Sequence, residues 1–365
     1  MNLTIFIITF NRPKFVDLII RYFLERNFDC NLIFVDGSEN PFKKDNLKII
    51  KNYRKIYKKK IGYVFSKNQL KAIHSLVKKI STKYCLFSND DDLPGKNFLE
   101  ESIDFLDNNK NYITTNGNMA TANIKFSAKK YELSNFRFAE VKTLNINADS
   151  VDKRYLRFNY QEGFVYGVYR KKDFKNIFSI IEKLCKIIKN PVKKIEHWIS
   201  FKLLTITFAT YNLLNGNIRS SKKLMMTRLN HIQFIQSSSI DYYDKFGGWY
   251  INDFYKDNDV YNKFLSKQLA YFFKKIKEQT ILNLIYLHIY MRASTRLPRY
   301  FYHVHKSICP KAFNFSEKFL ILRNYPQYIY FKVSRIISKL FFFDKLIFLI
   351  ENKKEIDTLK KFFRK

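Results

Sequence analysis

The 365-residue chain has few of the residues that mark several common kinds of binding site. Its four cysteines are far apart and form no Cys-x-x-Cys pair, which argues against a disulfide framework and against a zinc site. It has only nine glycines and no glycine-rich phosphate loop of the dehydrogenase or P-loop type. No apolar run reaches the ~18 residues of a membrane-spanning helix, and the N-terminus lacks the features of a signal peptide. We therefore expect a cytoplasmic protein with reduced thiols.

Acidic residues are also scarce relative to basic ones, and the net charge is +34. Such a charge favours an anionic partner, which could be nucleic acid, an acidic membrane surface or a phosphorylated substrate. The chain is rich in Lys, Asn, Ile, Phe and Tyr, so a compositional bias of the whole genome explains the charge equally well. The charge alone therefore does not select a function.

Apolar runs alternate with amphipathic segments in the N-terminal part of the chain. The apolar runs predict strands over residues 3–10, 31–35, 61–65 and 84–87. The segments after them predict helices over residues 13–26, 69–80 and 96–108 and a basic, helical or irregular connection over residues 43–60. Asn11 is the expected N-cap of the first helix. This β-α order predicts an α/β fold with a doubly wound, mostly parallel sheet and right-handed crossovers.

Three consecutive carboxylates, Asp90, Asp91 and Asp92, directly follow the fourth predicted strand. They are therefore expected at the carboxyl edge of the sheet, where open α/β sheets bind ligands. Like charges so close together repel one another, and burying them without a counter-charge is costly. Mn²⁺ or Mg²⁺ is the simplest counter-charge, because hard cations take carboxylate oxygens and share them with a diphosphate. The alternative is an acidic surface turn that caps the next helix.

The loops after the first, second and fourth predicted strands carry three motifs, which are Thr9-Phe10-Asn11-Arg12-Pro13, Asp36-Gly37-Ser38 and Asn89-Asp90-Asp91-Asp92. Further motifs lie at residues 163–170, 196–200, 228–231 and 237–239. In this order and spacing they resemble the family 2 glycosyltransferases of GT-A fold, especially bacterial glycosyltransferase-domain proteins of surface polysaccharide loci. The resemblance covers residues 1–240 and implies a GT-A nucleotide-sugar domain there. Beyond it the composition shifts and helical patterns dominate, which predicts a basic, aromatic-rich helical domain over residues 241–365.

The resemblance implies roles in donor binding for the residues of these motifs. Thr9 and Asp36 would contact the base of the donor, although many members of the family have two aspartates where this chain has Asp36. Asp90 and Asp92 would bracket the metal and the sugar phosphate, with Asp92 as the direct ligand. The neighbouring side chains of the same loops, Asn11, Arg12 and Asp91, complete the expected donor site.

Three basic side chains are further candidates near the diphosphate. Lys67 and Lys71 follow the third predicted strand and could add positive charge to the leaving group, or they could belong to a solvated helix face. His231 falls where several GT-A enzymes complete the metal shell with a histidine, and imidazole is an acceptable third ligand. The alternative for His231 is a polar loop residue.

A carboxylate must also deprotonate the acceptor hydroxyl as it attacks the sugar. Glu196 falls where the family places this base, although the usual Glu-Asp pair reads Glu196-His197 here. Glu162 is the second candidate and could instead hold the acceptor, whereas Asp173 fits a helix cap. One base and one in-line displacement would invert the anomeric centre, as the family resemblance implies.

Two amphipathic stripes lie near the C-terminus. One spans residues 329–341, and the other comprises Ile356, Leu359, Phe362 and Phe363 among lysines. Basic helices of this kind can lie on an anionic membrane surface, which would place the protein at the inner face of the cytoplasmic membrane. Otherwise they pack on the catalytic domain or on a second copy of the chain in a homo-oligomer.

The resemblance implies a glycosyltransferase that moves a sugar from a nucleotide-sugar donor to a glycan or lipid-linked glycan in capsule, O-antigen or related synthesis. A UDP-sugar is the favoured donor, with CMP- and GDP-sugars as alternatives. A sugar nucleotidyltransferase has a similar sheet, but its glycine-rich first loop is missing between Thr9 and Pro13. A non-enzymatic nucleic-acid-binding protein would fit the charge, but it would leave the three aspartates unexplained.

Overall fold

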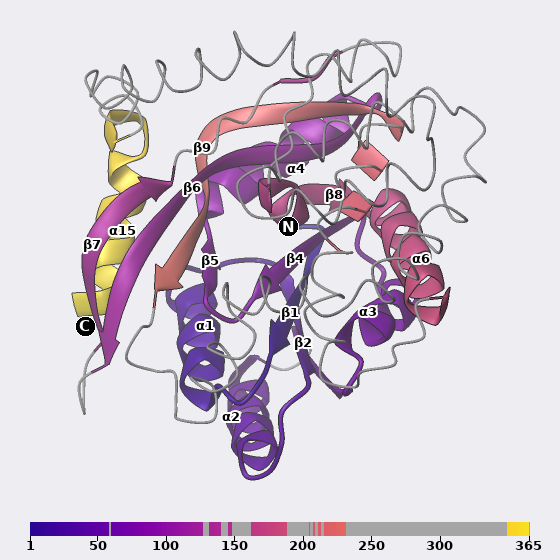
Figure 1. Cartoon of the computed structure of the whole chain (residues 1–365). Coiled ribbons are helices and arrows are strands. Elements are labelled where there is room, and N and C mark those ends of the chain that lie inside the picture. Colours follow the sequence, from indigo (N-terminus) through magenta and orange to yellow (C-terminus); the bar gives the residue numbers. More distant parts are fainter. Residues whose placement is uncertain are drawn as a thin grey trace, which may run out of the picture.

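The computed structural model describes residues 1–57, 60–126, 131–139, 145–147, 162–187, 204, 207–208, 211–212, 215–230 and 349–364. Four parallel strands form the first half of its sheet, as the apolar runs predict (Figure 1). They are β1 (Leu3–Thr9), β2 (Asn31–Asp36), β3 (Ile61–Phe65) and β4 (Tyr84–Asn89), in the spatial order β3-β2-β1-β4. The predicted doubly wound α/β fold is confirmed.

Helices cover both faces of these four strands. α1 (Pro13–Glu25) packs with α2 (Phe42–Tyr57), and α3 (Gln69–Val77) packs with α6 (Lys171–Ile187) (Figure 1). The α6 helix lies against the sheet, because its Phe174 stacks on Phe6 of β1 at a centroid distance of 5.6 Å. Apolar side chains therefore fill the space on each side of β1, which explains why its residues form a nearly continuous apolar run.

The order of the strands reverses at β1. The chain adds β2 and β3 on one side of β1 and then places β4 on the other side. In open α/β sheets, ligands bind in the crevice outside the carboxyl ends of the strands at such a switch point. Thr9 is the last residue of β1, and the three aspartates directly follow β4.

The second half of the sheet has mixed strand directions. It consists of β5 (Asp92–Pro94), β6 (Tyr112–Phe126), β7 (Tyr131–Ala139), β8 (Val168–Arg170) and β9 (Asn217–Asn230). β8 is antiparallel to β4 and β6, whereas β9 is parallel to β6 and antiparallel to β5. α4 (Lys96–Asn108) packs against β6 and β9. None of these strands is among the four that the apolar runs predict.

The start of α1 differs from the prediction. The N-cap of this helix is Arg12, which makes no capping hydrogen bond with its side chain, and Pro13 occupies the first turn. Asn11, the expected N-cap, has a φ of 57°, a left-handed conformation that asparagine tolerates better than most residues. Its Oδ1 accepts a hydrogen bond of 2.9 Å from the backbone N of Glu39, so Asn11 contacts the loop after β2 instead.

The last helix, α15 (Lys353–Arg364), packs on the domain formed by the first part of the chain. Its apolar stripe is buried, and it includes Ile356, Leu359, Phe362 and Phe363. The ring of Phe362 meets Tyr22 of α1 edge-on at 5.5 Å. This helix therefore packs on the domain, as one of the two alternatives predicts. The stripe at 329–341 and the predicted boundary at 240 lie outside the described residues.

Candidate functional site

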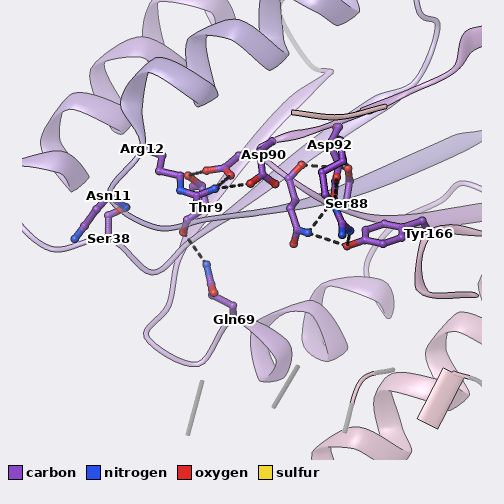
Figure 2. Close-up of polar contacts among 12 residues, drawn as sticks. Thr9, Asn11, Arg12, Ser38, Gln69, Ser88, Asp90, Asp92 and Tyr166 are labelled. Carbon is purple, nitrogen blue, oxygen red and sulfur yellow. Dashed lines mark hydrogen bonds and ion pairs between the residues drawn. The ribbon is translucent and has the colours of Figure 1, made fainter. Parts of the chain in front are cut away.

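Thr9 and Asp90 meet across the switch point between β1 and β4. These strands pair in parallel up to Ile8 and Asn89, so the residues that follow lie side by side. The hydroxyl of Thr9 donates a hydrogen bond of 2.6 Å to Oδ2 of Asp90 (Figure 2). Both side chains are buried. The sequence predicted this proximity from the order of the strands alone.

Arg12 supplies positive charge to the first two aspartates. Its Nη1 lies 3.1 Å from Oδ1 of Asp90 and 2.8 Å from Oδ2 of Asp91 (Figure 2). Burial raises the pKa of Asp90 to about 6, and the charge of Arg12 opposes that rise. Burial likewise disfavours the charge of Arg12, but Asp90 and Asp91 together outweigh it and raise the pKa of the guanidinium. Arg12, at the start of α1, is therefore an ionised partner of the loop formed by Asp90, Asp91 and Asp92, which we call the acidic loop.

Asp92 is held by a second arginine, which comes from the other half of the sheet. Its carboxylate is fully buried, and Oδ1 lies 3.1 Å from Nε of Arg228 in β9. Asn89 Nδ2 donates a hydrogen bond of 2.9 Å to the other carboxylate oxygen. The hydroxyl of Tyr166 accepts from Arg228 Nη2 at 2.7 Å and from Asn89 Nδ2 at 2.9 Å. Burial raises the pKa of Asp92, and the charge of Arg228 opposes that rise.

Sequence reasoning assigned no role to Arg228, Tyr166 or Asn89. The available signal was the charge balance, because three adjacent acids need cationic partners wherever they are buried. The charge balance does not identify the side chain or ion that supplies the positive charge, and Arg228 is 136 residues away from Asp92 in the sequence.

The fit of the site to a divalent cation depends on its donor atoms. Within the described residues, no group of three His, Cys, Asp or Glu side chains is placed to hold a metal ion. Asp90 and Asp92 nevertheless offer the hard carboxylate oxygens that Mn²⁺ and Mg²⁺ prefer. The predicted third ligand, His231, directly follows the last residue of β9 and lies outside the described residues. The donor chemistry therefore fits such a cation, which would share Asp92 with Arg228.

Asp36, at the end of β2, uses its buried carboxylate to hold its own loop. Oδ1 accepts from the backbone N of Ser38 at 2.7 Å. Oδ2 accepts from Asn46 Nδ2 at 3.1 Å and from the hydroxyl of Tyr63 at 2.8 Å. The side chain lies at the predicted edge of the sheet, but these three donors surround it. Its contact with a nucleotide base stays a prediction.

The loops after β1 and β2 are joined to each other. The backbone N of Asn11 donates to Oγ of Ser38 at 2.7 Å. Nε2 of Gln69 lies between the two strand ends and donates to the backbone oxygen of Thr9 at 2.8 Å (Figure 2). It also donates to the backbone oxygen of Val35 at 2.8 Å. The two loops therefore keep a fixed position relative to one another at the edge of the sheet.

The other predicted site residues lie in three kinds of place. Lys67 and Lys71 are exposed, just after β3 and in the first turn of α3. Glu162 is the first residue of the short 3-10 helix η1 (Glu162–Tyr166), and the position of its side chain is not among the described features. Glu196 lies outside the described residues, as does His231. Their predicted roles stay predictions.

Residues 4–166 match the protein-family model described as "Glycosyl transferase family 2". Over these residues the chain is similar to the family 2 glycosyltransferases. The match begins in β1 and ends at Tyr166, so it includes Thr9 and all three aspartates. The match confirms the resemblance seen in the motifs, and the sheet is that of a GT-A-like fold. Arg228 lies beyond the matched residues.

Two solved structures of S. aureus TarS are similar to this chain at 13% and 14% identity. The first gives a TM-score of 0.44 and covers 84% of this chain and 55% of that chain, so our chain spans about half of its length. The second, of TarS residues 1–349, gives a TM-score of 0.46 and covers 84% of this chain and 91% of that one. A comparison with curated proteins found no match.

Proposed function

We propose that the family 2 glycosyltransferase domain transfers a sugar from a nucleotide-sugar donor to a hydroxyl of a glycan or lipid-linked glycan, with inversion. The pathway we propose is bacterial surface polysaccharide synthesis, such as that of capsule or O-antigen. The observation that carries the proposal is the contact of Thr9 with Asp90 at the switch point, which fixes the acidic loop where such sheets bind ligands. The family match favours this activity over a nucleotidyltransferase and over a nucleic-acid-binding protein.

The donor end of the proposal rests on charge. A departing nucleoside diphosphate is anionic, and preorganised positive groups stabilise that charge in the transition state. Arg12 and Arg228 lie on either side of the acidic loop with side chains that are 30% and 32% exposed, whereas Asp92 is fully buried. In the pairs Arg12–Asp90 and Arg228–Asp92, the arginine side chain is therefore more exposed than the aspartate side chain. A UDP-sugar is the favoured donor, with GDP- and CMP-sugars as alternatives.

Mn²⁺ or Mg²⁺ would be held by Asp92 and Asp90, with His231 as a further ligand. When bound, it would add positive charge to the leaving phosphate. Asn89 and Arg228 keep the carboxylate of Asp92 oriented, and Thr9 does the same for Asp90. Both carboxylates are thus held in position by the chain itself, without the donor.

At the acceptor end, Glu196 is the proposed general base and Glu162 the alternative. This part of the proposal depends on the family motifs. A positioned carboxylate that takes the proton of the attacking hydroxyl contributes on the order of 10²–10⁴ in rate. Replacing the correct residue by Gln should stop turnover and leave donor affinity unchanged. Comparison of Glu196→Gln with Glu162→Gln by product formation and by donor titration decides between them; normal turnover in both variants would remove both.

Calorimetric titration of the full chain with UDP, GDP and CMP, with and without Mn²⁺, tests the donor proposal. We expect a nucleoside diphosphate to bind more tightly with Mn²⁺ present, and Asp92→Asn to abolish that difference. Asp104→Asn is the matched control, because Asp104 is an exposed carboxylate on α4 away from the loop. If no nucleotide binds in any condition, the proposed activity is wrong. If the Asp92→Asn variant keeps the full effect of Mn²⁺, the metal is assigned to the wrong residue.

A further inference from the structure

We propose that Glu355, in the last helix of the chain, positions the acidic loop through the residues that directly follow Asp92. In this proposal α15 holds the short strand β5, which begins with Asp92, in the place where the donor needs it. Glu355 is thus a positioning residue, since it does not itself touch the donor. The effect on the donor rests on the proposed function, whereas the effect on the loop does not.

The first link runs from Glu355 to the start of α4. The carboxylate is almost completely buried, and its Oε1 accepts a hydrogen bond of 3.1 Å from the backbone N of Lys96. Lys96 is the first residue of α4, and the N-cap of that helix is Gly95, which has no side chain to offer. A carboxylate near a helix N-terminus accepts hydrogen bonds from free backbone N–H groups and favours the helix dipole. Glu355 therefore does the work of a capping side chain from 259 residues away.

The second link runs from Glu355 to the end of β5. Oε1 also accepts from Nη1 of Arg26 at 2.6 Å, and the same nitrogen donates to the hydroxyl of Tyr22 at 2.8 Å. That hydroxyl donates in turn to the backbone oxygen of Pro94 at 2.6 Å. Pro94 is the last residue of β5 and lies two positions after Asp92. Two routes therefore connect one carboxylate to the segment that directly follows Asp92.

The third link joins the start of α15 to β9, the strand that carries Arg228. Oδ1 of Asn352 accepts from the backbone N of Leu224 at 2.7 Å, and its Nδ2 donates to the backbone oxygen of Lys222 at 3.1 Å. In the same stretch of β9, the backbone oxygen of Met225 accepts from Gly95 at 2.9 Å. The segment around α15 therefore contacts β9 directly and reaches the end of β5 through Arg26 and Tyr22.

The carboxylate of Glu355 also forms a buried ion pair with Arg26. The side chains of Arg26 and Glu355 are only 8% and 5% exposed. Removal of one member of such a pair leaves an uncompensated charge in the interior, which is far more disruptive than loss of a surface pair. We therefore expect loss of the Glu355 carboxylate to be felt where its hydrogen bonds end, at Pro94, Gly95 and Lys96.

Two variants interrupt the support at different points. Glu355→Gln removes the charge, whereas Tyr22→Phe removes only the hydroxyl that reaches Pro94 and keeps the ion pair of Arg26 with Glu355. Asp357→Asn is the matched control, because Asp357 is an exposed carboxylate in the same helix. Tyr22→Phe also keeps the proposal testable if Glu355→Gln fails to fold.

Hydrogen–deuterium exchange of the full chain should be measured on peptides that contain Gly95 and Lys96, well below the unfolding temperature of each variant. We expect exchange there to be about tenfold faster in Glu355→Gln and Tyr22→Phe, and UDP affinity with Mn²⁺ to fall by about tenfold. Asp357→Asn should behave like the parent. Unchanged exchange in both variants, with only a lower unfolding temperature, would overturn the proposal.

The two readouts separate this proposal from the proposed function. Faster exchange with unchanged UDP affinity would overturn the positioning role, because the loop would then move without consequence for the donor. If the parent binds no nucleotide, the proposed donor is wrong, and the exchange data alone decide whether Glu355 holds the loop.

Discussion

Arg228 lies directly opposite Asp92 in the antiparallel pair of β5 and β9, with Nε 3.1 Å from Oδ1 of the buried carboxylate. The aspartate belongs to the matched family domain, whereas the arginine comes from a strand beyond it. The acidic loop is therefore complete only when β9 has paired with β5. The site therefore depends on the second half of the sheet as well as on the first.

Arg228→Met should destabilise the protein strongly, because it leaves the charge of Asp92 buried without its partner. We expect the free energy of unfolding to fall by about 3 kcal/mol, measured by urea denaturation. Arg219→Met is the control on the same strand, since Arg219 pairs with Glu101 and both side chains are partly exposed. That variant should lose less than about 1 kcal/mol. Similar losses in the two variants would contradict the account of Asp92.

Gly95→Ala should also be destabilising, although the φ of Gly95 is an ordinary −75°. The reason is space: a Cβ at this position would lie 1.9 Å from the backbone oxygen of Leu224. The clash would push β9 away from β5, and we expect a loss of about 3 kcal/mol in thermal or chemical unfolding. At Gly62, a Cβ would lie 3.3 Å from a side-chain atom of Ile33, which can adjust. Gly62→Ala should therefore be much milder, and a reversed order of the two would refute the argument.

Phe362→Ala tests whether α15 packs on the domain or lies on a membrane. The ring is buried against Tyr22, so its loss should lower the free energy of unfolding by about 3 kcal/mol. Binding to vesicles of anionic lipid, measured by co-sedimentation, should not change. Ile350→Ala is the control, because Ile350 is 66% exposed near the same helix. A variant that keeps its stability and loses vesicle binding would instead support a membrane role for this face.

The buried thiol of Cys30 predicts a dependence of stability on pH. Burial raises the pKa of Cys30 to about 12 from an ordinary value of 9.0. Above pH 9 the unfolded chain therefore releases a proton that the folded protein keeps, and the free energy of unfolding falls as pH rises towards 12. Cys30→Ala should lack this contribution, so between pH 8 and 10 its stability should decline by about 1 kcal/mol less than that of the parent. Parallel pH profiles in urea denaturation would show that Cys30 titrates normally.

The sequence predicted the first half of the fold well because each of its elements has a strong local signal. The strand β3 and the helix α4 begin and end where the apolar patterns predict. The strands β6 and β9 contain many Asn, Thr, Ser and Lys residues, and their pairing is with segments far away in the chain. Strand preference depends on such neighbours more than on the residues themselves, so these strands gave no usable signal.

The site could be predicted only in part, for a related reason. The position of the three aspartates follows from the order of the strands, and their need for a counter-charge follows from electrostatics. The identity of the partners does not follow, since Arg228 reaches Asp92 through the pairing of β5 with β9. Asn11 was misassigned because a good N-cap residue is also a residue that tolerates positive φ, and here the second property decides.

The hydrogen bonds between the loops after β1 and β2 limit how this protein can be redesigned. Asn11 contacts both Ser38 and Glu39, and Gln69 spans the two strand ends. A graft that imported one loop from a relative would leave buried polar groups without partners. An attempt to change donor preference should therefore transplant both loops and Gln69 together, as one cassette.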